Sequence, residues 1–337
     1  MAAIDARFNL RQRLRMNGEL SPFNKRVTLA VIAALVAAGL LARLSPAVAK
    51  PFVTPEILVL GDSQLSFGSG KLMLDFFQKF DRHCSRFVTD EALRKRIANM
   101  RTQMIGARST SLQSWVTKSG KSWSSLCKKD KTWGVNASVW GHNATPGRLY
   151  HQMGEGKNFD VCRKELSPLQ ALLRRKYYAP DLLVFYLIGN GSGRLAKNAR
   201  AADQDVAALV SQLPPMQKCV FMTTTPIHTP RRNRTRVKAE RALKAAFARA
   251  GNRCTFVPAL TPVSIAAIQG KRQYFRRHKS GKVKDPFHPN EKATRKFLSV
   301  IKPKFCRAIA GELSMPMPAP RTRAKCGLKA RSILSLT

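Results

Sequence analysis

Short apolar runs alternate with amphipathic segments along most of the chain, and several of the runs end in glycine or polar residues. The apolar runs contain many β-branched and aromatic residues, as buried strands do, whereas the intervening segments repeat apolar residues with the period of a helix. The predicted strands cover residues 56–61, 103–106, 181–193 (ending in its glycine-rich turn), 218–226 and 254–260. The predicted helices cover residues 71–80, 92–100, 203–213, 237–251 and 290–301.

Strands that alternate with helices predict a parallel sheet covered on both faces, which is an α/β fold of three layers. In such a fold, ligands bind beyond the carboxyl ends of the strands. Asn290 is the first residue of the last predicted helix, where its side-chain oxygen is expected to cap an early N–H group. Residues 314–337 are basic and proline-rich, so we expect a flexible tail there.

The first 49 residues predict export. A net basic segment precedes an uncharged apolar run at 27–42, and Ala47-Val48-Ala49 follows as a small-x-small cleavage pattern, which favours a signal peptide and a mature chain that begins at Lys50. The run is slightly short for a spanning helix, so a retained membrane anchor is the second interpretation and a buried core helix the third. Both leading interpretations place residues 50–337 outside the cytoplasm, in the periplasm or secreted.

The charge of the chain is unusual. Its 337 residues include 60 Lys and Arg against 19 Asp and Glu, a net charge of +41, and the first 49 residues carry only seven of the basic side chains. Such an excess attracts anionic polysaccharides or an acidic membrane surface, although a basic surface without a specific ligand remains an alternative. No sequence-specific nucleic-acid binding is expected. The ordinary apolar content excludes disorder throughout.

The cysteine pattern also fits an exported protein. No C-x-x-C pair and no zinc-finger spacing occurs, so we expect no metal site and no cofactor. The chain has seven cysteines, and in an oxidising compartment some of them should form disulfide bonds. Because seven is odd, at least one thiol stays free or bonds to another chain. Spacing does not fix the connectivity; a bond between Cys306 and Cys326 would staple the tail. The cysteines are Cys84, Cys127, Cys162, Cys219, Cys254, Cys306 and Cys326.

Polar residues with catalytic potential follow the predicted strands. Ser63 follows the first strand, Gly106 ends the second and Asn190 follows the third, while Asp285 and His288 lie on the predicted loop that enters the last helix. A nucleophilic serine needs a histidine base oriented by an acid, and an acyl transition state needs donors aimed at its oxyanion. Ser63, His288 and Asp285 supply the first set. The N–H groups of Ser63 and Gly106 and the Asn190 amide supply the second.

Four motifs in order resemble those of the SGNH (GDSL-like) hydrolases. They are "GDSQ" at 61–64, "IGARSTSLQSW" at 105–115, "GNGSG" at 189–193 and "DPFHP" at 285–289. The resemblance implies a flavodoxin-like α/β/α sandwich within a hydrolase domain at 50–313, with Ser63 as nucleophile, Asp285 and His288 completing a triad, and Gly106 and Asn190 in the oxyanion hole. It also implies ester hydrolysis or acyl transfer on a sugar, lipid or small ester.

The motifs depart from the family pattern at two positions. Gln64 stands where many members have leucine, and we expect this change to leave the chemistry untouched. Gly191 stands where many members have aspartate, which removes one possible supporting group.

An insertion at about 107–178 separates the second and third predicted strands by far more than a typical connection. It contains all four tryptophans of the chain. We expect a small elaboration with its own aromatic core; a platform on which aromatic rings pack against sugar rings is the alternative, and the two can coexist. The tryptophans are Trp115, Trp123, Trp133 and Trp140.

Three functions are compatible with this sequence. The first is an extracytoplasmic serine esterase that removes an acyl group, in particular O-acetyl, from a carbohydrate, a cell-envelope polymer or a lipid. The second is an O-acyltransferase that uses the same site on a sugar acceptor. The third is a basic polyanion-binding protein on a hydrolase scaffold, which the complete set of Ser63, His288 and Asp285 disfavours. The oligomeric state is left open.

Overall fold

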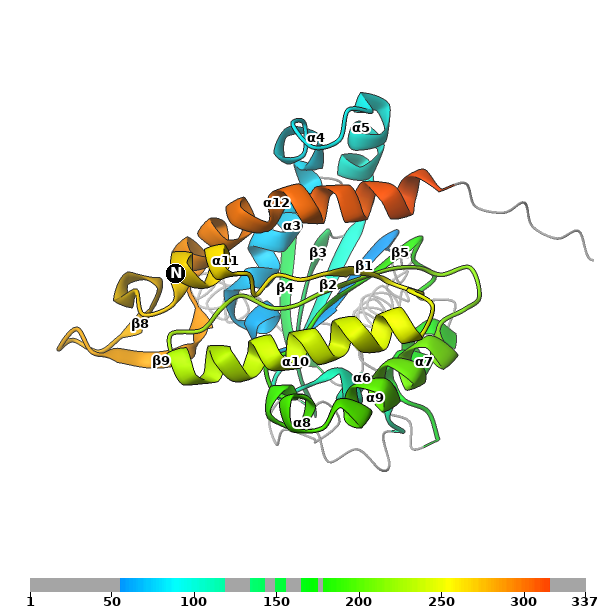
Figure 1. Ribbon diagram of the computed structural model, residues 1–337. Helices are drawn as coiled ribbons and strands as arrows, with labels where there is room; N and C mark the ends of the chain where they lie inside the picture. The colour runs from blue at the N-terminus through cyan, green and yellow to red at the C-terminus, as the bar shows by residue number, and fades with distance from the viewer. Residues whose placement is uncertain (1–54, 119–133, 143–148, 156–164, 175–177, 316–337) are drawn as a thin grey trace, which may run out of the picture. The chain divides into compact units, whose positions relative to one another are not determined.

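The computed structural model describes residues 55–118, 134–142, 149–155, 165–174 and 178–315 (Figure 1). In these residues a seven-stranded sheet has the order β4-β3-β2-β1-β5-β6-β7. Its strands are β1 (Ile57–Gly61), β2 (Thr102–Ala107), β3 (Gly134–His142), β4 (Leu149–Glu155), β5 (Leu182–Tyr186), β6 (Lys218–Met222) and β7 (Thr255–Val257). Within this described part, β2, β1, β5, β6 and β7 are parallel, and their 2-1-3-4-5 order confirms the flavodoxin-like prediction.

Helices cover both faces of the sheet. Figure 1 shows α12 and α10 on opposite sides of it. One face carries α3 (Gly70–Gln78), α5 (Glu91–Asn99) and α12 (Glu291–Ser314). The other carries α6 (Leu112–Val116), α7 (Pro168–Arg174), α8 (Ser192–Lys197), α9 (Ala199–Gln212) and α10 (Pro230–Arg249). The short helices α4 (Phe80–His83) and α11 (Pro262–Ile268) complete the α-helices of the described chain.

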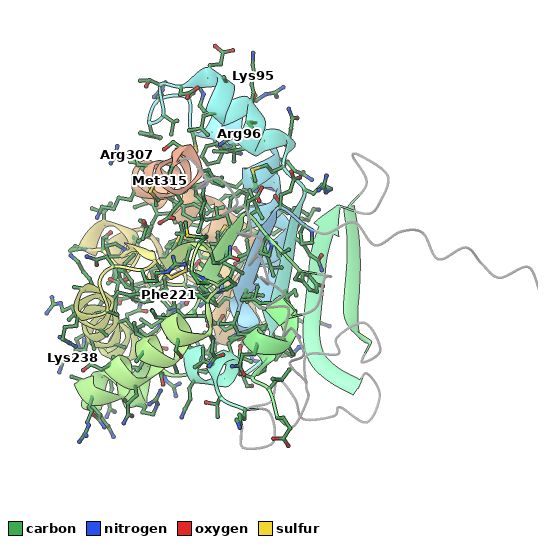
Figure 2. The ribbon with its side chains drawn as sticks, turned by 90° about the vertical axis from the view of Figure 1, so that its right-hand side faces the viewer. Lys95, Arg96, Phe221, Lys238, Arg307 and Met315 are labelled. Atoms are coloured by element: carbon green, nitrogen blue, oxygen red, sulfur yellow. A yellow bond between two sulfur atoms is a disulfide. The ribbon has the colours of Figure 1, made fainter. Side chains whose placement is uncertain are left out.

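Alternation along β1 explains why both faces need cover. Leu58 and Leu60 pack into one apolar layer and Ile57 and Val59 into the other, and all four side chains are fully buried. A strand that is buried on both sides has a continuous apolar sequence, and this pattern predicted β1. In Figure 2, Phe221 of β6 lies among the packed interior side chains, whereas Lys238 lies at the periphery.

The last helix is longer than its sequence pattern predicts. It continues past the predicted end at residue 301, with Pro303 inside it, and reaches Ser314. A proline lacks a backbone N–H group and usually disrupts a helix, but burial of Phe305 and Ile309 against the sheet stabilises the continuation. The predicted cap is confirmed, because Asn290 Oδ1 accepts the N–H group of Ala293 at 3.1 Å.

The insertion contributes strands to the main sheet. Two antiparallel strands, β3 and β4, extend the sheet beyond β2, which the sequence did not predict. Trp115, on α6, is fully buried in the main core with residues of α7, so the expectation of a separate aromatic core is wrong for this residue. Trp123 and Trp133 lie outside the described residues, and for Trp140 only the backbone, paired with Met104, is described.

The segment that carries Asp285 and His288 is a hairpin and not the predicted loop. It consists of β8 (Phe275–Arg277) and β9 (Val283–Pro289), follows a 3₁₀ turn at Arg272–Tyr274, and is seen at one end of the sheet in Figure 1. Phe275 packs with α11 and with the start of α12 in a small third apolar cluster. Backbone pairing with β8 therefore restrains the strand that precedes α12.

Two disulfide bonds link distant elements. Cys84, after α4, bonds Cys306 of α12, and Cys219 of β6 bonds Cys254 just before β7. The expected bond between Cys306 and Cys326 is therefore wrong, because helix packing brings Cys84 to Cys306. Such bonds are typical of proteins in oxidising compartments. Cys127, Cys162 and Cys326 lie outside the described residues.

The predicted leader at 1–49 and most of the predicted tail at 314–337 also lie outside the described residues. Among the helices that the structure describes, none has the length and hydropathy to cross a membrane. The export prediction therefore rests on the sequence pattern together with the two disulfide bonds.

The double substitution Cys84→Ala/Cys306→Ala is expected to lower the free energy of unfolding by about 2–5 kcal/mol, since the bond constrains a long loop of the unfolded chain. Its sequence separation is 222, against 35 for Cys219–Cys254. All four cysteines are fully buried, so Cys219→Ala/Cys254→Ala is a matched comparison that should lose less stability. Urea unfolding measures the free energy of unfolding of both double variants. A larger loss of stability for Cys219→Ala/Cys254→Ala would contradict this account.

Candidate functional site

Ser63 lies at a tight junction between a strand and a helix. β1 ends at Gly61, helical structure begins at Ser63, and a π-helical turn at Leu65–Ser69 leads into α3. A Cβ atom on Gly61 would lie 2.7 Å from the Leu65 side chain, so a glycine is needed for this close turn. The junction leaves Ser63 partly exposed beyond the carboxyl end of β1, as predicted.

The carboxylate of Asp62 fixes this junction. Its side chain is 1% exposed, and its two oxygens accept the backbone N–H groups of Gln64 at 2.9 Å and of Gly189 at 3.1 Å. Gly189 follows β5, so one buried side chain connects the turn after β1 to the loop after the neighbouring strand. Because Ser63 and Asn190 are adjacent to the bonded residues, Asp62 sets their relative position.

A buried arginine supplies the charge opposite Asp62. Burial raises the pKa of Asp62 above its ordinary value, although the N–H group of Gln64 and the charge of Arg236 oppose the rise. Arg236, on α10, is 2% exposed and donates to the carbonyl oxygen of Thr225 at 2.9 Å and to the Thr224 hydroxyl. A buried charge needs such compensation, so the pair is part of the scaffold of the site.

A bulge in β9 brings Asp285 and His288 together. Asp285 pairs with Arg276 and Pro289 with Phe275, so residues 286–288 are extra to the ladder. Asp285 Oδ1 accepts the N–H groups of Phe287 at 3.0 Å and of His288 at 3.2 Å. Bulges of this kind redirect side chains next to active sites. Here the bulge places the His288 ring beside the carboxylate three residues earlier.

The three predicted catalytic side chains form one hydrogen-bonded chain. His288 Nδ1 is 2.7 Å from Asp285 Oδ2, and His288 Nε2 is 2.9 Å from Ser63 Oγ. A carboxylate can only accept, so a neutral imidazole carries its hydrogen on Nδ1 and offers the lone pair of Nε2 to the serine hydroxyl. This is the order of contacts that allows a serine to lose its proton to a histidine.

Asp285 is suited to remain ionised. Partial burial opposes its ionisation, but the hydrogen bonds from His288 and from the backbone of Phe287 outweigh burial, and the pKa of Asp285 is lowered. Acceptance of the His288 ring hydrogen therefore persists to acidic pH, and is lost only when the pH falls through this lowered pKa.

Gln64 has a role that the sequence analysis did not predict. Its buried side-chain amide donates to the carbonyl oxygen of Phe287 at 3.0 Å and to that of Thr225 at 3.2 Å. The residue after Ser63 thus holds the residue before His288. A leucine at this position could make neither hydrogen bond, so Gln64 connects two segments of the site, a contact that the sequence analysis did not include.

Gly106 does not reach the site. It lies inside β2, paired with Gly61 on one side and Ser138 on the other, and a Cβ atom there would lie 2.4 Å from the backbone nitrogen of Ser66. Its lack of a side chain lets the π-helical turn pass over the strand. Ser109 reaches the site instead, with a positive φ of 57° that is unusual for a residue other than glycine.

Asn190 is held in place at the site. Its amide nitrogen donates one hydrogen to the carbonyl oxygen of Thr110 at 3.0 Å, which leaves the second hydrogen of that group for another acceptor. The flanking Gly191 lies close to Ser111, whose Cβ atom would be 3.0 Å from a Cβ atom added at 191. A larger residue at 191 would press on this loop.

These groups line a cavity of about 620 Å³. Its apolar surface includes Phe67, which is 48% exposed and whose ring centroid is 4.7 Å from that of His288. The lining residues are Asp62, Ser63, Gln64, Phe67, Arg108, Ser109, Gly189, Asn190, Ser192, Gly193, Ile227, Arg232, Thr235, Arg236, Phe287 and His288. The cavity has room for an acyl group together with part of a carrier.

Comparisons with known proteins give weak similarities. No protein-family model matches the chain, and no curated protein matches it significantly. Among solved structures, the chain is similar to a mutant acetyl esterase with acetate ion (13% identity, TM-score 0.39), covering 77% of this chain and 99% of that one. A carbohydrate esterase family 3 protein from Talaromyces cellulolyticus gives 13% identity, the same coverage and a TM-score of 0.36. A DUF4886 family protein from Bacteroides uniformis gives 12% identity and a TM-score of 0.39, and the match covers 80% of this chain and 88% of that one.

At these TM-scores, the activity of this chain has to be inferred from its own site. The fold is a three-layer α/β sandwich of flavodoxin-like strand order, and Ser63, His288 and Asp285 are joined beyond the carboxyl ends of its strands. Of the residues that the resemblance to SGNH hydrolases selects, Ser63, Asn190 and His288 line the cavity, Asp285 lies behind His288, and Gly106 lies inside β2.

Gly189→Ala is expected to lower the free energy of unfolding by about 1–3 kcal/mol, because the new methyl group would press on a buried carboxylate. Its Cβ atom would lie 2.7 Å from Asp62 Oδ2. Gly193→Ala is the matched control, since that exposed position in α8 has no atom within 4 Å of an added Cβ. Thermal unfolding should show no loss for the control; equal losses would contradict the close contact at Asp62.

Proposed function

We propose that this protein is a serine esterase that removes an acyl group, with O-acetyl the preferred case, from a carbohydrate or another component of the cell envelope. The observation that carries the proposal is the hydrogen-bonded chain from Ser63 through His288 to Asp285 at the edge of a cavity. The sequence pattern of residues 1–49 and the two disulfide bonds support an extracytoplasmic location, in the periplasm or secreted.

In this proposal Ser63 Oγ attacks the ester carbonyl carbon while His288 Nε2 takes the hydroxyl proton. The imidazolium is stabilised by the ionised Asp285, whose lowered pKa keeps it charged. His288 then gives the proton to the leaving alkoxide of the carrier, and the acyl group remains on Ser63. Water, deprotonated by His288, attacks the acyl carbon; the bond to Ser63 Oγ then breaks, Ser63 takes the proton back from His288, and the acid is released.

The oxyanion of each tetrahedral intermediate is stabilised by hydrogen-bond donors fixed in advance. We assign this role to the N–H group of Ser63 and to the remaining amide hydrogen of Asn190. We assign the third donor to the backbone N–H group of Ser109 in place of that of Gly106. The strained backbone of Ser109 lies at the cavity, whereas Gly106 does not line it. Asp62 sets the distance between the Ser63 and Asn190 groups through its bonds to Gln64 and Gly189.

Acyl transfer to a sugar hydroxyl would use the same acyl-enzyme with a different acceptor, and no observation favours it over hydrolysis. A polyanion-binding protein without catalysis has no need of a serine, histidine and aspartate in hydrogen-bonded order. The geometry of these three groups therefore favours an enzyme.

Ser63→Ala is expected to lower kcat on an activated acetyl ester by about 10³-fold or more, because no nucleophile remains. His288→Ala should match it, since the members of such a triad act as a unit, and Asp285→Ala should lose less. Release of nitrophenol measures the rates, and thermal unfolding confirms that each variant is folded. A fluorophosphonate probe should label Ser63 in the wild-type chain. Full activity of Ser63→Ala would refute the mechanism.

Asn190→Ala is expected to lower kcat by roughly 10²–10³-fold with little change in KM, since the oxyanion needs the donor more than the ground-state carbonyl does. Ser192→Ala is the control, because Ser192 also lines the cavity but its hydroxyl donates to the carbonyl oxygen of Gly189. Steady-state kinetics on the same acetyl ester measures both variants. An unchanged kcat with a raised KM would assign Asn190 to substrate binding instead.

A further inference from the structure

Two arginines stacked on aromatic rings stand at the cavity of the proposed active site. The guanidinium carbon of Arg108 lies 4.6 Å from the centroid of the Phe67 ring, and that of Arg232 lies 4.6 Å from the centroid of the Phe287 ring. All four side chains line the same cavity. An arginine above a ring is restrained by the stacking while its N–H groups remain directed outward from the ring edge.

Both rings are close to the catalytic base. The Phe67 ring contacts the His288 ring, and Phe287 is the residue directly before His288. Phe67 is 48% exposed and Phe287 37% exposed, which places them among the most exposed large apolar side chains of the described chain. The stacked guanidinium groups therefore lie near His288, in contrast to the basic side chains spread over the surface.

The carboxylate that lines the cavity does not neutralise Arg232. Among the lining residues, the carboxylate is Asp62, which is buried and bonded to two backbone N–H groups, with Arg236 as its opposite charge. In the described part of the chain, no carboxylate lies within 4 Å of Arg232. Arg232 is also exposed, so its guanidinium group is accessible to a ligand.

We propose that Arg232, stacked on the Phe287 ring, forms an anion subsite, and that the preferred substrate is an ester whose carrier bears a carboxylate or phosphate group next to the esterified position. The inference rests on the proposed esterase function and specifies its substrate class. A guanidinium group binds either oxyanion through paired, charge-assisted hydrogen bonds. The aromatic rings supply apolar contact for the carrier itself.

The test compares substrates that differ only in the anionic group. One pair is a monoacetylated methyl glucuronoside and the corresponding monoacetylated methyl glucoside, which differ in a carboxylate at C6. A second pair is monoacetylated glycerol 3-phosphate and monoacetylated glycerol. The measured quantity is the preference, defined as kcat/KM for the anionic ester divided by kcat/KM for its neutral partner. The pair with the larger preference identifies an acidic polysaccharide or a phosphate-bearing carrier as the source.

The wild-type chain is expected to show a preference of about tenfold or more for at least one pair, and Arg232→Gln should reduce it about tenfold, the effect of one charge-assisted hydrogen bond. Arg232→Lys keeps the charge but loses the planar fork, and should retain part of the preference. The matched control is Arg234→Gln, which removes the same charge from an exposed position of α10 outside the cavity. It should leave the preference within about twofold of wild type.

The outcomes separate the subsite from the esterase function. A wild-type preference near one, with both esters cleaved, overturns the subsite and leaves the esterase proposal standing. Equal losses in Arg232→Gln and Arg234→Gln also overturn it, because the effect would then come from overall charge. Absence of cleavage of every ester, together with no labelling of Ser63 by the fluorophosphonate, overturns both proposals.

Discussion

The site depends on a carboxylate that has been removed from water. Asp62 is buried beyond the end of β1, and its two oxygens hold the backbone of Gln64 and of Gly189. These bonds and the charge of Arg236 compensate the loss of hydration, so the carboxylate is stable only when the turn after β1 and the loop after β5 are both in place. The position of Ser63 relative to Asn190 follows from this constraint.

A second connection joins the turn that carries Ser63 to the strand that carries His288. The amide of Gln64 binds the carbonyl oxygens of Phe287 and Thr225, and Arg236 donates to the same Thr225 oxygen. Elements from the start, the middle and the end of the chain are thus fixed around one small volume. Preorganisation of this kind reduces the reorganisation needed as charge develops in the transition state.

Much of the fold follows from local patterns. The strand at β1 and the cap at Asn290 are correct because buried strands and helix starts have strong short-range signals. The end of α12 was predicted too early, because Pro303 is a local signal to stop and burial of Phe305 and Ile309 outweighs it. The hairpin β8–β9 was predicted as a loop, since its bulge interrupts the alternation that identifies a strand.

The sequence by itself selected Ser63, Asp285 and His288 as candidates, because they lie in short motifs that carry the residue types of a serine-histidine-aspartate set. Only the tertiary structure decided which neighbours support them. Arg236 and Arg234 are indistinguishable within one basic run, yet one is buried near Asp62 and the other is exposed, because α10 packs one side against the sheet. The partner of Cys306 and the location of Gly106 under the π-helical turn likewise depend on segments far apart in the chain. Contacts of that range arise from packing of whole elements, and no local pattern encodes them.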